Sequence, residues 1–148
     1  MSDHALAQLN IARLRAPLDA PELAEFVAGL DPINALADRT PGFLWRLQTE
    51  EGDATALRPF GDDVIVNLSL WESLEALHGF VFRSDHAEFL RARRKWFERS
   101  HEPMAVLWWI PAGTLPEIAD AQAALRRLRR NGPTPDAFTF RSPFSAPT

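Results

Sequence analysis

The sequence predicts a single α+β domain in which helices cover one face of a four-stranded antiparallel sheet. Apolar and polar residues alternate over residues 5–12 and 63–71, as in half-buried strands, whereas apolar residues recur at helical spacing after Pro21 and Pro116. The 148 residues, 46% of them hydrophobic, suffice for one core and are too few for two ordinary domains. We therefore expect one domain over residues 1–140 and a flexible tail over residues 141–148.

The strands are recognised by alternation and by the turn residues that bound them. In the first strand, Leu9 and Ile11 lie on one side and Gln8 and Asn10 on the other. Pro41-Gly42 is a helix stop, and the second strand follows it. The expected strands are residues 5–12, 43–48, 63–71 and 104–110.

Helices fill the segments between these strands. Pro32 lies inside the first helix and predicts a kink or a break near Asp31. Ser73 and Ser84 are suitable N-caps for the second and third helices. The expected helices are residues 21–36, 73–81, 84–97 and 116–130. The order β-α-β-β-α-β, with one further helix at the C-terminus, is the ferredoxin-like split βαβ arrangement.

A sheet covered on one face leaves its other face open to water, and both faces of this sheet carry large apolar side chains. A second copy of the chain is the simplest cover, so we expect a homodimer of the dimeric α/β-barrel type. In the strand over residues 63–71, Val64, Val66, Leu68 and Leu70 lie on one side and Ile65 and Trp71 on the other.

Several short motifs resemble a known group of proteins. Pro41-Gly42-Phe43 and the run from Trp71 to Leu77 resemble the antibiotic-biosynthesis-monooxygenase-like superfamily of dimeric α/β barrels. The run from Phe80 to Glu88 resembles an uncharacterised bacterial domain-of-unknown-function family within that fold. The resemblance extends from about residue 6 to residue 140, and it implies the fold more than a reaction. Further matching segments are residues 94–97, 108–113 and 132–140.

The same superfamily includes cofactor-free monooxygenases and haem-degrading enzymes. The resemblance implies that a haem degrader would need an asparagine on the first strand, which Asn10 matches. It would also need a tryptophan and a histidine after the third strand, where this chain has Phe80 and Leu90. We therefore expect no haem and no other tightly bound cofactor.

Composition excludes several classes of protein. The net charge of −4 gives no general attraction to nucleic acid, and the absence of cysteine excludes disulfides and thiolate chemistry. His78, His86 and His101 have no metal-site spacing, so no metal is expected. The apolar stretch over residues 104–110 is far shorter than the ~20 residues of a membrane helix, and the first residues do not resemble a signal peptide. We expect a cytoplasmic protein without a nucleic-acid or membrane partner.

Polar side chains on the strands are the first candidates for a binding site. They alternate with apolar residues in strands otherwise suited to burial, so they must bond to each other, to water or to a ligand. They are Gln8 and Asn10 on the first strand, and Asn67 and Ser69 on the third. The alternatives are a pocket for a small aromatic molecule and a water-filled interior or polar dimer contact. Aromatic walls would come from Trp45 (or Arg46), Trp71 and Trp109.

His86 is the candidate acid or base, because histidine titrates near neutral pH and this residue begins a helix. A capping or surface role is the alternative. Arg83 is a candidate for holding an anionic substrate, with a structural salt bridge as its alternative. Two hypotheses follow: a small-molecule enzyme without a tightly bound cofactor, monooxygenase- or isomerase-like, and a non-catalytic dimeric ligand-binding or interaction module.

Overall fold

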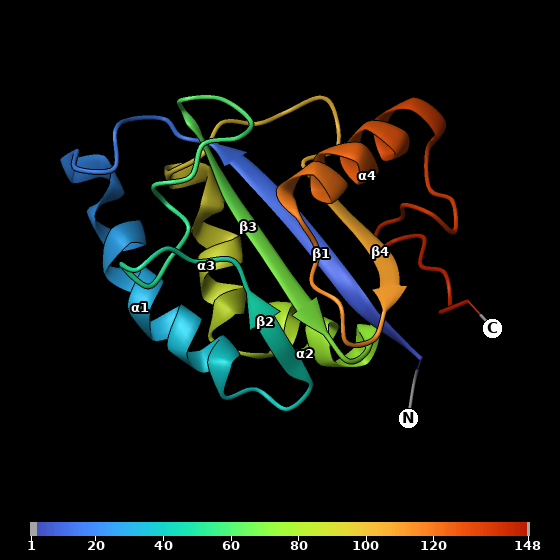
Figure 1. Cartoon of the computed structure of the whole chain (residues 1–148). Coiled ribbons are helices and arrows are strands. Elements are labelled where there is room, and N and C mark those ends of the chain that lie inside the picture. The colour runs from blue at the N-terminus through green and yellow to red at the C-terminus, as the bar shows by residue number, and fades with distance from the viewer. Residues whose placement is uncertain (1–2, 148) are drawn as a thin grey trace.

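The computed structural model, which describes residues 3–147, has one antiparallel sheet with strand order β2-β3-β1-β4 (Figure 1). The element order confirms the predicted split βαβ arrangement. The strands are β1 (His4–Arg13), β2 (Phe43–Arg46), β3 (Val64–Trp71) and β4 (Ala105–Pro111). The helices are α1 (Ala24–Asp38), α2 (Leu74–Arg83), α3 (His86–Ala92) and α4 (Ile118–Asn131), with 3-10 turns η1 (Pro21–Leu23) and η2 (Arg93–Lys95). Residues 1, 2 and 148 of the predicted domain and tail lie outside the described residues.

The helix boundaries confirm some expectations and correct others. The hydroxyl of Ser73 caps α2 by accepting the backbone N–H of Ala76 at 3.1 Å. Of the kink or break expected near Asp31, the break is wrong, because α1 continues across Pro32. Pro32 lies on the exposed side of the helix, where water can solvate the carbonyl that proline leaves unbonded. The third helix ends at Ala92, well before residue 97, because the chain tightens into η2 there.

Helices α1, α2 and α3 cover one face of the sheet, and we call it the cavity face. Part of this face is a closed apolar layer, in which Trp71 is fully buried against Phe80 of α2 with ring centroids 5.3 Å apart. At the other end, Trp96 closes a smaller cluster with Leu14 and Leu23. The layer around Trp71 consists of Leu6, Ala37, Trp71, Leu77, Phe80, Leu107 and Phe138.

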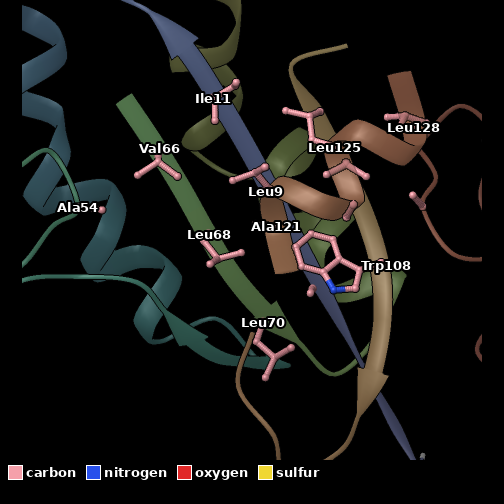
Figure 2. Packing of buried hydrophobic residues seen from close by; sticks show 14 of the residues in the cluster. Leu9, Ile11, Ala54, Val66, Leu68, Leu70, Trp108, Ala121, Leu125 and Leu128 are labelled. Atoms are coloured by element: carbon pink, nitrogen blue, oxygen red, sulfur yellow. The ribbon is translucent and has the colours of Figure 1, made fainter. Parts of the chain in front are cut away.

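Helix α4 covers the opposite face, which we call the α4 face (Figure 1). Figure 2 shows Leu9, Leu68 and Trp108 of the sheet packed toward Leu125 of α4. Ala54, from the connection between β2 and β3, closes the edge of this cluster. The apolar face that was expected to require a second copy is therefore buried within the chain, and that argument for a dimer is wrong. The homodimer itself stays a prediction.

The segment after α4 docks along the outer strand β4. Leu107 and Phe138 exchange two backbone hydrogen bonds of 2.8 Å, and the indole Nε1 of Trp109 donates to the carbonyl oxygen of Phe144 at 2.8 Å. These contacts cover part of an edge that would otherwise offer unpaired backbone groups. Among residues 3–147, no helix has the length and apolar character needed to cross a lipid bilayer.

Candidate functional site

A cavity of about 680 Å³ lies between the cavity face of the sheet and helices α1 and α3. Its apolar walls include Phe26 and Leu30 of α1 and Phe89 of α3, with Trp96 beyond α3. Asn10 and Asn67 also line it and are exposed, so the cavity is accessible to solvent. This size and mixture of apolar walls with a few polar groups are typical of small-molecule sites.

A hydrogen-bonded network of four side chains lies on the sheet wall of this cavity. The pairing of β1 with β3 places Gln8 opposite Ser69 and Asn10 opposite Asn67. The amide Nε2 of Gln8 donates to Asn67 Oδ1 at 2.6 Å and to Ser69 Oγ at 3.0 Å. The indole Nε1 of Trp71 also donates to Ser69 Oγ, at 2.9 Å. Gln8 and Ser69 are thus buried and bonded, as buried polar groups must be.

The network leaves specific groups available to a ligand. Both hydrogens of Gln8 Nε2 are used, and Ser69 Oγ accepts twice. Within residues 3–147, no protein partner bonds the Oε1 of Gln8, the Nδ2 of Asn67 or the hydroxyl hydrogen of Ser69. The sheet wall therefore offers both hydrogen-bond donors and an acceptor, all of them uncharged, to a molecule in the cavity.

His86 lines the same cavity from the start of α3, and its side chain is half-buried. Its Nδ1 lies 3.2 Å from the carbonyl oxygen of Val81, and its ring lies 5.0 Å from that of Phe80. Burial lowers the pKa of His86, and the Val81 hydrogen bond opposes part of that effect. Because a carbonyl oxygen can only accept, Nδ1 carries the proton in this contact. The neutral ring then has Nε2 free to accept a proton.

The cavity brings together five of the predicted site residues: Asn10, Asn67, Ser69, Trp71 and His86. Sequence reasoning placed Gln8 beside them on the first strand but did not identify it as the centre of the network. Only the strand register shows that its amide reaches both Asn67 and Ser69.

Three predicted residues do not line the cavity. Trp45 packs on the α4 face, because a register shift between Phe43 and Trp45 turns Arg46 toward the cavity instead. Trp109 donates to the tail, as described above, and Arg83 is exposed at the end of α2. Arg46 is held by Asp38 through a 2.8 Å ion pair.

Gly29 is a site residue that sequence reasoning missed. It lies on α1 under the ring of Phe89, and a Cβ added to it would lie 1.8 Å from Phe89 Cζ. The missing side chain thus lets α3 bring an aromatic ring close to α1 over the cavity. A glycine inside an otherwise regular helix is the signal that would have indicated this close approach.

The histidines considered for a metal site do not form one with neighbouring carboxylates. Among residues 3–147, no three histidine, cysteine, aspartate or glutamate side chains gather closely enough to hold an ion. His78 is exposed, and its ring lies 4.6 Å from that of Phe82.

The sequence matches, over residues 5–148, the family described as "Domain of unknown function (DUF3291)". No curated protein matches it significantly. Among solved structures, a mutant of SnoaB, a cofactor-independent oxygenase from Streptomyces nogalater, shares 19% identity over 78% of this chain and 100% of its own, with a TM-score of 0.45. PA3566 from Pseudomonas aeruginosa shares 14% identity over 77% of this chain and 98% of its own, with a TM-score of 0.49.

Proposed function

The chain belongs to the family described as Domain of unknown function (DUF3291), and we propose that it is an enzyme acting on a small aromatic molecule without a tightly bound cofactor, in a monooxygenase- or isomerase-like reaction. One observation supports this most: a single cavity has aromatic walls, a wall of uncharged hydrogen-bonding groups and a half-buried histidine. Pockets with these components are the usual sites of small-molecule chemistry.

Each component has a distinct role in the proposed reaction. Phe26, Phe89 and Trp96 contact the flat faces of the substrate, and Gln8 and Asn67 bond its oxygen substituents. The Nε2 of His86 removes a proton from an acidic O–H or C–H group of the substrate. In an isomerase the proton returns to another atom of the same molecule. In a monooxygenase, the substrate carbanion adds to molecular oxygen, the second substrate, and gives a peroxide. Loss of water from the protonated peroxide then leaves one oxygen atom on the carbon as a carbonyl group, and the substrate itself supplies the electrons.

The binding part of this proposal is tested by closing the cavity. Leu30→Trp places a large ring on the cavity side of α1, whereas Val27→Trp, on an exposed position of the same helix, is the matched control. With the fluorescent probe N-phenylnaphthylamine, we expect wild type and Val27→Trp to bind equally and Leu30→Trp to bind at least about tenfold more weakly, since its ring occupies the probe's space. Equal binding by all three proteins would refute the cavity as a ligand site.

The catalytic part is tested by proton exchange, which does not require the final product to be known. A panel of aromatic hydroxy-ketones is incubated with the protein in deuterated water, and deuterium uptake at carbon is followed by NMR. We expect exchange to fall by about 10²- to 10⁴-fold in His86→Gln, the usual contribution of a general base. Binding of N-phenylnaphthylamine should be unchanged. If exchange is equally fast in His86→Gln, His86 is not the base.

The second candidate function is a non-catalytic ligand-binding module. The observation that favours it is the hydrogen bond between His86 Nδ1 and the Val81 carbonyl, because this contact also suits a structural histidine that ends the preceding turn. This alternative predicts that the cavity binds the probe, that Leu30→Trp abolishes binding, and that no compound of the panel exchanges its protons.

We further propose a homodimer in the bacterial cytoplasm. The support is general: two-fold dimers are the commonest assemblies of soluble proteins, and the fold class is that of the dimeric α/β barrels. Helix α4 already occupies the α4 face, so the dimer would use another surface. Light scattering of the purified protein should give twice the monomer mass of 16.6 kDa, and a concentration-independent monomer would contradict the proposal.

A further inference from the structure

Four arginines lie close together beside the cavity, two of them in its lining, and we call them the arginine rim: Arg15, Arg93, Arg94 and Arg99. Arg93 and Arg94 line the cavity and are exposed. Arg15 is brought beside them because its backbone N–H donates to the carbonyl oxygen of Trp96 at 2.9 Å and its Nε to that of Phe97 at 3.2 Å. The rim thus joins the end of β1 to η2 and the chain that follows it.

Among the described residues, no carboxylate forms an ion pair with the arginine rim. The ion pairs formed within residues 3–147 join Arg13 to Asp63, Arg46 to Asp38 and Arg129 to Glu102, and none includes a rim residue. Glu98 lines the same region but makes no ion pair there. Desolvation, together with the positive charges of Arg93, Arg99 and Arg15, lowers the pKa of Arg94. Like charges held together in a protein of net charge −4 repel one another, and an anion at this position would relieve the repulsion.

Away from these arginines, most of the cavity lining is apolar or uncharged. The other charged lining residues include Glu102, which is paired with Arg129, and Asp53, which accepts hydrogen bonds from Thr55. The sheet wall presents amides and a hydroxyl, the helix wall presents aromatic rings, and Arg46 is neutralised by Asp38. Positive charge is therefore concentrated at the arginine rim, where guanidinium groups can bond carboxylate or phosphate oxygens in pairs.

From this distribution we infer that the ligand of the cavity is an organic anion, with a flat apolar body between the sheet and α1 and α3 and a carboxylate, sulfonate or phosphate group held by Arg93 and Arg94. This inference rests on the proposed function and adds the charge of the ligand. The inference places the anionic group at Arg93 and Arg94 of η2, whereas the sequence alone offered Arg83 as the candidate.

The test uses two probes with the same aromatic body. Anilinonaphthalene sulfonate carries an anionic group, and N-phenylnaphthylamine does not. We expect wild type to bind the sulfonate more tightly, and Arg93→Gln/Arg94→Gln to weaken sulfonate binding by at least about tenfold, the loss expected for bonds to a charged group. Binding of the neutral probe should not change, which also shows that the variant is folded. Added salt should weaken the sulfonate complex of wild type alone.

The matched control removes two exposed arginines from another surface. Arg126→Gln/Arg127→Gln, on α4, changes the net charge equally and should leave both probes unaffected. Equal loss of sulfonate binding in both double variants, or no loss in Arg93→Gln/Arg94→Gln, would overturn the inference while the cavity remains a site for the neutral probe. If the neutral probe does not bind wild type, the proposed function fails as well. Competition by benzoate and by inorganic phosphate distinguishes an organic carboxylate from a phosphate group.

Discussion

On the α4 face, every strand contributes aliphatic or aromatic side chains that pack against one helix and a loop of the same chain, and Leu68 there is 1% exposed. On the cavity face, Asn67, the residue just before Leu68 in β3, is exposed and accepts a hydrogen bond from Gln8. The two faces thus differ in role. The α4 face stabilises the fold by excluding water, and the cavity face leaves space and polar groups for a ligand. Mutations on the two faces should therefore differ in kind as well as in size.

The largest expected effect is on the α4 face. Leu68→Ala removes a fully buried side chain and should lower the free energy of unfolding by about 2–5 kcal/mol, the usual cost of such a cavity. Its neighbour Asn67→Ala should cost less than about 1 kcal/mol, because the side chain is exposed and loses one hydrogen bond. Urea denaturation measures both. Equal losses would show that the two faces do not differ as described.

The second expected effect is on the polar network. Ser69→Ala removes the acceptor of the Trp71 indole N–H and of one Gln8 hydrogen, and should cost about 1–3 kcal/mol because buried donors remain unbonded. Ser145→Ala, at an exposed position of the tail, should be neutral. Urea denaturation again provides the comparison. If Ser69→Ala leaves the free energy of unfolding unchanged, a water molecule replaces the hydroxyl, and this wall of the cavity is hydrated.

The third effect concerns the close approach of α1 and α3. Gly29→Ala forces the Phe89 ring to move, at a cost of about 1–3 kcal/mol for overpacking, offset by roughly 1 kcal/mol of helix propensity. Gly79→Ala in α2, where an added Cβ meets nothing within 4 Å, should be stabilising. Thermal unfolding compares the two variants. If both are stabilised alike, the ring moves freely and does not define the cavity wall.

The smallest effect is the pH dependence contributed by His86. Burial lowers its pKa in the folded protein below the ordinary value of 6.5, so the unfolded chain binds this proton more tightly. The neutral His86 ring contributes its full share of the free energy of unfolding above pH 6.5. This contribution is lost as the pH falls from 6.5 toward the pKa of His86 in the folded protein. We expect His86→Gln to flatten the profile of unfolding free energy against pH on the acid side of pH 6.5, as measured by urea denaturation at a series of pH values. If the slope of unfolding free energy against pH is the same in His86→Gln as in wild type, His86 is not the source of this pH dependence.

Several features of the site followed from local patterns. Alternation along residues 63–71 predicted that Asn67, Ser69 and Trp71 lie on one face of a strand, since successive side chains point to opposite sides. The same rule separated Gln8 and Asn10 from Leu9 and Ile11. The start of a helix at His86 was recognisable from the serine and aspartate that precede it.

Other features depended on contacts between segments far apart in the chain. The register of β1 against β3 decided that Gln8 bonds Ser69, and the irregular pairing of β2 decided that Arg46 faces the cavity in place of Trp45. The docking of Phe144 on Trp109 and the packing of Leu125 on the sheet are likewise tertiary.

The sequence by itself determined the order of the strands and helices and the polar side of β1 and β3. These properties depend on the period of the backbone and on neighbouring residues, which a sequence displays directly. The tertiary structure alone decided what covers each face and which arginines surround the cavity. An apolar pattern shows that a face must be buried, but it does not identify what covers that face. The hydrophobic effect is non-directional, so a helix of the same chain can bury the face as well as a second copy can.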